Sequence, residues 1–215
     1  MYKDNQKTQH VRCAICLTPL LSRVSFVSLV KDFPLCQSCI HQFELLDDVV
    51  DFHHYPLRIL YGYNDFFKEL LFQYKGLYDY ALKDAFLCLF HDELIKKYND
   101  YLVVCAPSWM EDNKVRGFAP VPTIASTFSS HVFCGIYKKE KYKQSDLKYE
   151  ERVQVDKKLG IRHGECIKGK KVLILDDVMT SGATLKACLT YVLQNEPAKV
   201  ELLVLASKNK KIEIK

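Results

Sequence analysis

Residues 171–184 read Lys-Val-Leu-Ile-Leu-Asp-Asp-Val-Met-Thr-Ser-Gly-Ala-Thr, and this stretch decides the fold. Residues 172–175 form a short unbroken apolar run, which is typical of a strand covered on both faces of a parallel sheet. Asp176 and Asp177 stand where that strand should end, and a turn of small residues leads into a predicted helix over 185–195. The stretch therefore predicts the carboxyl end of a parallel strand, where ligands bind in open parallel sheets.

The turn after this strand has the chemistry of a phosphate site. Small hydroxyl residues at a helix N-terminus offer backbone N–H groups, hydroxyls and the positive end of the helix dipole. The adjoining carboxylates accept hydrogen bonds, and the 2′,3′-diol of a ribose supplies two donors close together. We therefore expect a ribose 5-phosphate here, since the sequence has neither a P-loop nor a G-x-G-x-x-G motif. The alternative is a buried strand followed by an ordinary polar turn with solvated acids.

Four cysteines near the N-terminus form a second motif. Cys13-x-x-Cys16 is followed, after nineteen residues, by Cys36-x-x-Cys39, which is the spacing of a zinc site. Four thiolates complete the tetrahedral shell of Zn²⁺, so we expect a structural site without an open position. The alternative is two unrelated thiol pairs or redox CxxC motifs. Because so short a segment buries little core, zinc binding would supply its folding free energy.

Length and composition predict one domain of ordinary size with a small appendage. The chain has 215 residues, 48% of them hydrophobic, and a formal net charge of +5 that favours anionic ligands. We place the zinc module at residues 1–48 and the larger domain at residues 49–215. No stretch is apolar enough to enter a membrane, the N-terminus does not resemble a signal peptide, and nine cysteines are an odd number. We therefore expect a cytoplasmic protein.

The rest of the chain alternates between extended and helical patterns. Residues 43–57 suit a connector, and Asp65 is a candidate helix cap. The predicted strands cover 58–62, 102–106, 132–137 and 200–206, and the predicted helices cover 66–76, 77–98 and 122–130. Such βαβ alternation predicts an α/β fold, with a mostly parallel sheet and helices on both faces.

The string at residues 171–184 resembles the signature of type I phosphoribosyltransferases, which bind phosphoribosyl pyrophosphate (PRPP) with Mg²⁺. By that resemblance, Asp176 and Asp177 hold the ribose hydroxyls. The remaining ligand-binding residues that it implies, which surround the 5-phosphate, are Val178, Met179, Thr180, Ser181, Gly182, Ala183 and Thr184. The implied fold is the mostly parallel sheet of this enzyme class.

A four-cysteine zinc knuckle ahead of such a domain resembles the ComF family over nearly the whole chain. Residues 61–76 look like a helix of that family, and Arg116-Gly117-Phe118 matches its Arg-Gly-Phe-Asn-Gln segment. A further match to the family pattern is formed by Gln144, Leu147 and Arg152. Four positions depart from the family pattern, namely Gln73, Ala119, Pro120 and Val155. The resemblance implies a role in natural competence, handling imported single-stranded DNA on the cytoplasmic side with a ComFA-like helicase partner.

Two functional hypotheses remain open. One is a PRPP-binding protein of competence that need not catalyse a reaction, and the other is an active PRPP-dependent transferase of nucleotide salvage or synthesis. For catalysis the candidates are Asp176, Asp177 and Arg116, whose planar guanidinium suits pyrophosphate. The alternative for Arg116 is an exposed loop arginine. No sequence element identifies an acceptor.

Contact with single-stranded DNA is a separate hypothesis. Residues 137–143 combine tyrosines with lysines, and residues 208–215 form a lysine-rich tail. Lysines can follow a phosphate backbone while aromatic rings stack on bases. The alternative is a solvated basic loop and a solvated chain end.

Overall fold

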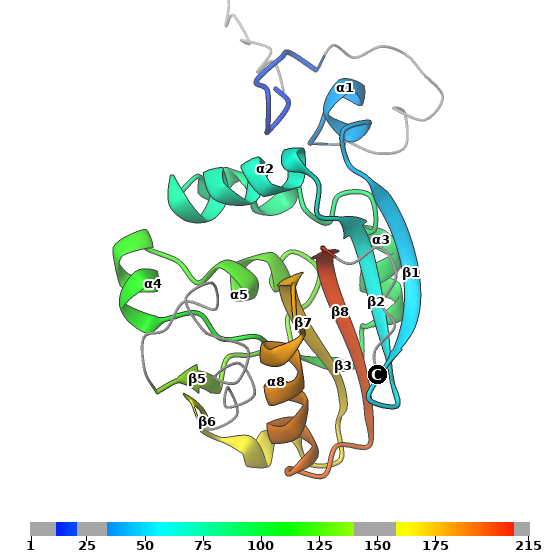
Figure 1. The fold of residues 1–215 in the computed structure, drawn as a ribbon, viewed down its shortest axis with the longest axis vertical. Coiled ribbons are helices and arrows are strands. Elements are labelled where there is room, and N and C mark those ends of the chain that lie inside the picture. Colours follow the sequence, from blue (N-terminus) through cyan, green and yellow to red (C-terminus); the bar gives the residue numbers. More distant parts are fainter. Residues whose placement is uncertain (1–11, 21–33, 140–157, 209–215) are drawn as a thin grey trace, which may run out of the picture.

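The sheet at the centre of the molecule has six strands, with helices on both of its faces (Figure 1). This computed structural model describes residues 12–20, 34–139 and 158–208. The strand order is β1-β2-β8-β7-β3-β4, in which β1 is antiparallel to β2 and the other neighbours are parallel. The predicted α/β fold with a mostly parallel sheet is therefore confirmed.

The elements follow one another in the order β, α, β. The strands of the large sheet are β1 (Leu45–Phe52), β2 (Tyr55–Gly62), β3 (Tyr101–Cys105), β4 (Val132–Phe133), β7 (Lys171–Met179) and β8 (Lys199–Ser207). The helices are α1 (Gln37–Ile40), α2 (Asp65–Gly76), η1 (Tyr80–Asp84), α3 (His91–Lys97), α4 (Met110–Arg116), α5 (Pro120–Ala125), η3 (Gly164–Ile167) and α8 (Ala183–Leu193). A small antiparallel sheet pairs β5 (Ile136–Lys138) with β6 (Leu159–Ile161).

The central strand β7 is buried on both faces, as its apolar run predicts. Val172 and Ile174 pack in the core layer beneath α8, whereas Leu173 and Leu175 pack in the layer beneath α2 and α5. All four side chains have no exposed surface. Because residues alternate between faces along a strand, one short run supplies both core layers.

Three predictions for individual elements were wrong. The expected connector over 43–57 contains β1, which pairs with β2 and forms the edge of the sheet. The expected helix over 77–98 is instead η1 and α3, which are separated by turns over residues 85–90, and Tyr78 before them takes a left-handed backbone conformation (φ 63°) that an α-helix does not include. The expected strand over 132–137 is two short strands in different sheets.

The bounds of the central elements also differ from expectation. β7 continues beyond Leu175, pairing Val178 with Ala206 of β8, and α8 ends at Leu193. The cap of α2 is Asn64 and not Asp65, because the side chain of Asn64 accepts a hydrogen bond from the N–H of Phe67. Such end effects depend on cap geometry, which the sequence does not specify to the residue.

The cysteine-bearing segment packs against the larger core. Phe43 lies with its ring centroid 4.9 Å from that of Tyr61 and 5.0 Å from that of Phe66. Cys13 and Cys39 are buried in the same core cluster. The division of the chain at residue 48 stays a prediction, and β1 passes through that position. No helix within the described ranges is both long and apolar enough to cross a membrane.

Candidate functional site

The site begins where β3 and β7 part. The two strands pair as far as Cys105 and Leu175, and the N–H of Ala106 still donates to the carbonyl of Leu175 at 2.8 Å. Pro107 follows and has no N–H to continue the ladder. β7 nevertheless runs on to Met179 along β8. A crevice therefore opens at the carboxyl ends of the parallel strands, as the fold class predicts.

A cavity of about 350 Å³ fills this crevice. Its walls come from the end of α2, the loop after β3, helices α4 and α5, strand β5, and the end of β7 with the start of α8. The lining residues are Lys75, Ala106, Pro107, Ser108, Trp109, Asp112, Arg116, Pro120, Val121, Lys138, Asp176, Asp177, Val178 and Thr184. Both predicted acids and the predicted arginine therefore lie in one pocket.

The two adjacent acids of the pocket have different environments. Asp177 forms an ion pair with Lys75, and the side chains are 13% and 30% exposed. Asp176 accepts a hydrogen bond from the N–H of Asp177 at 2.9 Å. Burial, and next the charge of Asp177, raise the pKa of Asp176 to about 7. One acid is therefore held as an ion pair, and its neighbour can change protonation near neutral pH.

Three cationic side chains surround these acids. Arg116 donates from Nε to the carbonyl of Lys75 at 2.8 Å and from Nη1 to Asn113 Oδ1 at 3.1 Å. Its guanidinium also lies 5.9 Å from the ring centroid of Phe118. Lys138 is partly buried, and this burial lowers its pKa. The pocket thus combines carboxylates with cations that could match the phosphates of a ligand.

The turn between β7 and α8 depends on a glycine. Gly182 has a φ of +75°, and a Cβ at this position would lie 2.9 Å from the ring of Phe52. Only glycine meets both conditions without strain. α8 begins directly afterwards and has no side-chain cap. Its N-terminal end therefore lies at the pocket wall, where Thr184 is a lining residue.

The side chains of the predicted phosphate turn differ in exposure, some lying at the surface and one in the core. Val178 and Thr184 line the cavity, whereas Thr180 and Ser181 are exposed beside it. Met179 is only 4% exposed and packs in the core. The side chain of Met179 therefore faces away from solvent, and its carbonyl accepts a hydrogen bond from the N–H of Lys208 at 3.2 Å.

The lining residues that the sequence did not predict as site residues include Lys75, Trp109, Asp112 and Lys138. Lys75 lies 102 positions from Asp177, so no local pattern joins them. The one available signal for Lys75 was its place beside the departure at Gln73. Lys138 was noticed as part of the basic segment, but the structure places it in the pocket.

The four cysteines form a separate site. Their Sγ atoms all lie within 4.8 Å of one another, and those of Cys16 and Cys36 are 3.6 Å apart. Zn–S bonds of about 2.3 Å in a tetrahedron place sulfurs about 3.8 Å apart, so the set fits zinc. Within the described residues, this is the one cluster of three or more His, Cys, Asp or Glu side chains that could hold an ion.

Comparisons with known proteins relate this chain to two kinds of protein. The family model described as "Phosphoribosyl transferase domain" matches residues 114–215. The chain is 30% identical over 128 residues to "Competence protein ComFC" of Streptococcus pneumoniae, and 28% identical over 130 residues to the Bacillus subtilis protein of that name. The chain is therefore similar to competence proteins over part of its length, and its C-terminal part matches a phosphoribosyl transferase domain.

The ComFC-like chain covers only part of these relatives. Each match takes in 60% of this chain, with 57% of the Streptococcus protein and 54% of the Bacillus protein. Among solved structures, a hypoxanthine-guanine phosphoribosyltransferase of Bacillus anthracis matches 62% of this chain and 75% of its own, at 14% identity and a TM-score of 0.39. A purine phosphoribosyltransferase of Pyrococcus horikoshii matches 60% and 76%, at 17% identity and the same TM-score, 0.39.

Proposed function

We propose that this ComFC-like chain binds PRPP with Mg²⁺ and acts in natural competence, in the handling of imported single-stranded DNA. One observation carries the ligand: the adjacent acids Asp176 and Asp177 share a cavity with the N-terminal end of α8 and with cations from three other elements. A cavity of about 350 Å³ suits a small molecule. The names of the two curated relatives support the competence role.

Each part of PRPP has a counterpart in the pocket. The ribose hydroxyls would donate to Asp176 and Asp177, and the 5-phosphate would accept from the turn before α8 and its first N–H groups. The pyrophosphate would face Arg116 and Lys138. Because a carboxylate accepts up to four hydrogen bonds, Asp177 can keep Lys75 and still bind a ribose hydroxyl.

Mg²⁺ would enter with the ligand. It binds proteins through one or two carboxylates together with substrate phosphates, and it retains several waters. Asp112, Asp176 and Asp177 line the cavity and offer such oxygens. When bound, the ion neutralises the charge of the pyrophosphate, while the protein residues hold the ribose and orient the phosphates.

A second candidate function is an active PRPP-dependent transferase of nucleotide salvage or synthesis. The observation that favours it is the position of Arg116 in the same cavity as Asp176 and Asp177, where its guanidinium could hold the pyrophosphate that leaves. Release of pyrophosphate from PRPP in the presence of a panel of bases and amines would support the transferase. Binding without pyrophosphate release would favour the non-catalytic role.

Thermal denaturation with increasing Mg-PRPP tests the binding site. A ligand that binds only the folded protein raises the melting temperature, by the equivalent of about 2.7 kcal/mol at 100 times Kd. We expect this shift in the wild type and its loss in Asp176→Ala/Asp177→Ala and in Thr180→Ala/Thr184→Ala. The control is Thr190→Ala, on the same helix, where the hydroxyl donates to the carbonyl of Lys186. Equal shifts in all four proteins would reject the site.

We further propose that the four clustered cysteines bind one structural Zn²⁺. A full thiolate shell leaves no position for a substrate, so the ion would stabilise the N-terminal segment. Elemental analysis should find about one zinc per chain, as a single tetrahedral site holds one ion. Cys36→Ser/Cys39→Ser should lose the zinc, and Cys166→Ser, an exposed thiol elsewhere, should keep it. Zinc retained in the double variant would contradict the assignment.

Contact with DNA is the least direct part of the proposed role. Tyr137, Lys138 and Lys139 are described, while residues 140–143 and the tail over 209–215 lie outside the described residues. Direct binding of single-stranded oligonucleotide, with affinity that falls steeply as salt rises, would support it. DNA binding that appears only when a ComFA-like helicase is added would place the contact on that partner instead.

A further inference from the structure

Two cysteines outside the zinc cluster lie side by side next to the pocket. β3 and β4 are parallel, and their register pairs Val103 with Val132 and Val104 with Phe133. The next residues along the two strands are Cys105 and Cys134. Side chains two apart on a strand share a face, so both cysteines lie on the face of Val103 and Val132. Their thiols interact, since each shifts the pKa of the other.

The two thiols of this pair differ in accessibility. Cys105 is 2% exposed, whereas Cys134 is exposed at the surface. The contact with Cys105 lowers the pKa of Cys134 to about 7, and the same contact, with burial, raises the pKa of Cys105. The exposed sulfur is therefore the reactive thiolate, and the buried sulfur is a thiol placed beside it.

Both cysteines also adjoin walls of the pocket. Cys105 directly precedes Ala106 and Pro107, which line the cavity. Cys134 lies shortly before Lys138, another lining residue. The segment between Cys134 and Lys138 is tightly packed, since a Cβ on Gly135 would lie 2.4 Å from the carbonyl oxygen of Arg162. A covalent bond between the two sulfurs would therefore act on both walls.

We propose that Cys105 and Cys134 form a redox modification site, which a peroxide converts into a disulfide that weakens ligand binding in the adjoining pocket. The Cys134 thiolate attacks hydrogen peroxide, so that an S–O bond forms, the O–O bond breaks and water leaves after protonation. The Cys105 thiol then attacks the sulfenic sulfur; the S–S bond forms, the S–O bond breaks and a second water leaves. Two sulfurs are oxidised and both peroxide oxygens are reduced.

Peptide mapping of the zinc-loaded full chain tests this site. Cleavage after lysine and arginine places Cys105 in residues 98–114 and Cys134 in residues 117–138. After brief treatment with hydrogen peroxide and alkylation of the free thiols, we expect these two peptides to be linked, and the link to be reversed by dithiothreitol. Because the contact with Cys105 lowers the pKa of Cys134, more of this thiol is thiolate at neutral pH, and we expect it to be oxidised faster than Cys166.

Single variants separate the roles of the two sulfurs. Cys105→Ser should abolish the link and leave a sulfenic acid on Cys134 that dimedone traps, while Cys166→Ser should leave the link unchanged. The site is overturned if no linked peptide forms, or if Cys134 is oxidised no faster than Cys166, which is also exposed.

The effect on the pocket rests on the proposed PRPP binding and has its own readout. The melting shift with Mg-PRPP should be smaller in the oxidised than in the reduced wild type, and equal in peroxide-treated and untreated Cys134→Ser. If the disulfide forms but the melting shift with Mg-PRPP stays as large as in the reduced protein, the proposed effect of the disulfide on the pocket is overturned. Absence of any shift in the reduced protein would instead contradict the proposed function, and the linked peptide would still establish the modification site.

Discussion

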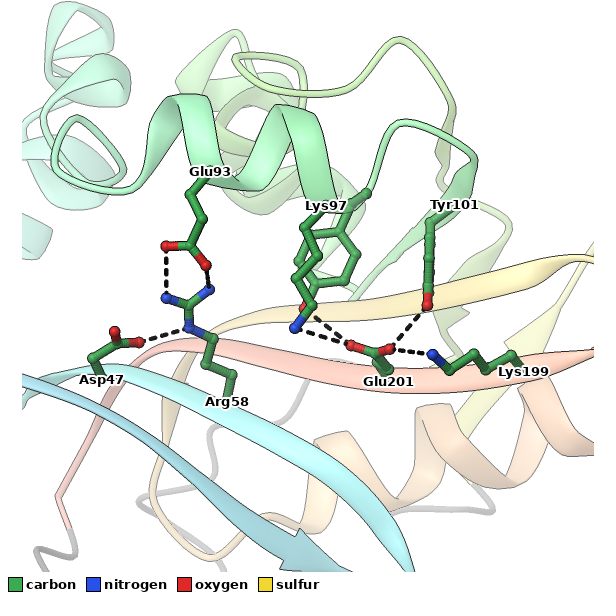
Figure 2. Close-up of polar contacts among 8 residues, drawn as sticks. Asp47, Arg58, Glu93, Lys97, Tyr101, Lys199 and Glu201 are labelled. Atoms are coloured by element: carbon green, nitrogen blue, oxygen red, sulfur yellow. Dashed lines mark hydrogen bonds and ion pairs between the residues drawn. The ribbon is translucent and has the colours of Figure 1, made fainter.

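The two ends of the parallel strands both hold charged side chains that are at least partly buried, but they hold them differently. At the carboxyl ends, Asp176 and Asp177 face a cavity together with Lys75 and Lys138. Towards the amino ends, Arg58 of β2 and Glu201 of β8 lie beneath α3, as Figure 2 shows. The first group is open to a ligand, while the second is closed by contacts within the protein.

Partners from several elements complete the closed end. Arg58 donates from Nη2 to Glu93 at 2.9 Å and from Nε to Asp47 at 2.6 Å. Glu201 accepts from Tyr101 at 2.8 Å and from Tyr98 at 3.2 Å, and it pairs with Lys199 at 2.8 Å. Burial opposes the ionisation of Glu201, yet Lys199, Tyr101 and Lys97 lower its pKa to about 2.

The pKa directions of the two buried acids express this difference. At Glu201 the donors outweigh burial, so the charge stabilises the fold. At Asp176 burial and the neighbouring carboxylate outweigh the cations, so the charge destabilises the fold when no ligand is bound. Buried charge alone therefore does not identify a site. A buried charge that the fold leaves uncompensated, beside a cavity, does.

The largest expected effect is on the pH dependence of stability. The folded protein holds the Asp176 proton more tightly than the unfolded chain, since the pKa rises from 3.8 to about 7. The contribution of Asp176 to the free energy of unfolding is therefore fully present below pH 4, and it is lost as pH rises through 7. A difference of about three pKa units corresponds to a loss on the order of 4 kcal/mol. Asp176→Asn should remove this loss, as measured by urea unfolding from pH 4 to 8 without ligand.

An acid at the other end of the strands is the matched control for this prediction. Asp100 is exposed, and its ion pair with Lys171 lowers its pKa instead. Asp100→Asn should therefore keep the fall in stability between pH 4 and 7. If Asp176→Asn and wild type have parallel profiles, the charge of Asp176 is compensated within the fold, and the contrast between the two ends disappears.

A somewhat smaller effect is expected at the closed end. Glu201→Ala leaves the hydroxyls of Tyr98 and Tyr101 without their carboxylate acceptor, which should lower the free energy of unfolding by about 3 kcal/mol. The control is Glu196→Ala, since Glu196 pairs with Lys168 in an exposed contact and should cost less than about 1 kcal/mol. Chemical denaturation measures both. Folded Glu201→Ala protein that no longer responds to Mg-PRPP would show that this end also serves the ligand.

The contact of Lys75 with Asp177 should affect the ligand more than the fold. Lys75→Met removes a cation from the pocket and releases Asp177, so Mg-PRPP should bind about tenfold more weakly, or about 1.4 kcal/mol. Its stability should change little, because the side chain is 30% exposed. Lys68→Met, an exposed lysine on the same helix, should bind like wild type. Tighter binding by Lys75→Met would mean that Lys75 competes with the ligand for Asp177.

The smallest expected effect separates the pocket from the proposed DNA contact. Lys138 lines the cavity and Lys139 is exposed beside it. Lys139→Ala should therefore reduce the salt slope of binding to a fluorescent single-stranded oligonucleotide by about one, and leave PRPP binding unchanged. Lys138→Ala should do the reverse. Equal effects of the two changes on DNA would indicate that the pocket and the DNA surface overlap.

Local sequence patterns were sufficient to predict the central strand and the four-cysteine cluster. The apolar run at residues 172–175 is buried on both faces as expected, because a strand that supplies two core layers must be apolar throughout. The spacing of the four cysteines predicted one cluster, since each CxxC turn brings two thiols together. Both signals lie within short segments, where neighbouring residues constrain one another directly.

Pairing between distant segments was not predictable in the same way. Residues 43–57 are of mixed composition and lean acidic, yet Leu45–Phe52 is a strand because the edge of β2 is there to pair with it. The expected long helix over 77–98 is replaced by η1 and α3, with turns over residues 85–90 between them and a left-handed Tyr78 before them. Propensity is a weak guide where tertiary contacts supply the hydrogen bonds.

By itself, the sequence determined the strand that carries the acids, the small-residue turn and the four-cysteine cluster, because each is encoded within a few neighbouring positions. Only the tertiary structure decided which side chains face those acids. Lys75 from α2, Asp112 and Arg116 from α4, and Lys138 from β5 reach one cavity because β3 ends at Cys105 while β7 continues. The pairing of β3 with β4 set Cys105 beside Cys134, since contacts between separate strands depend on register and not on local composition.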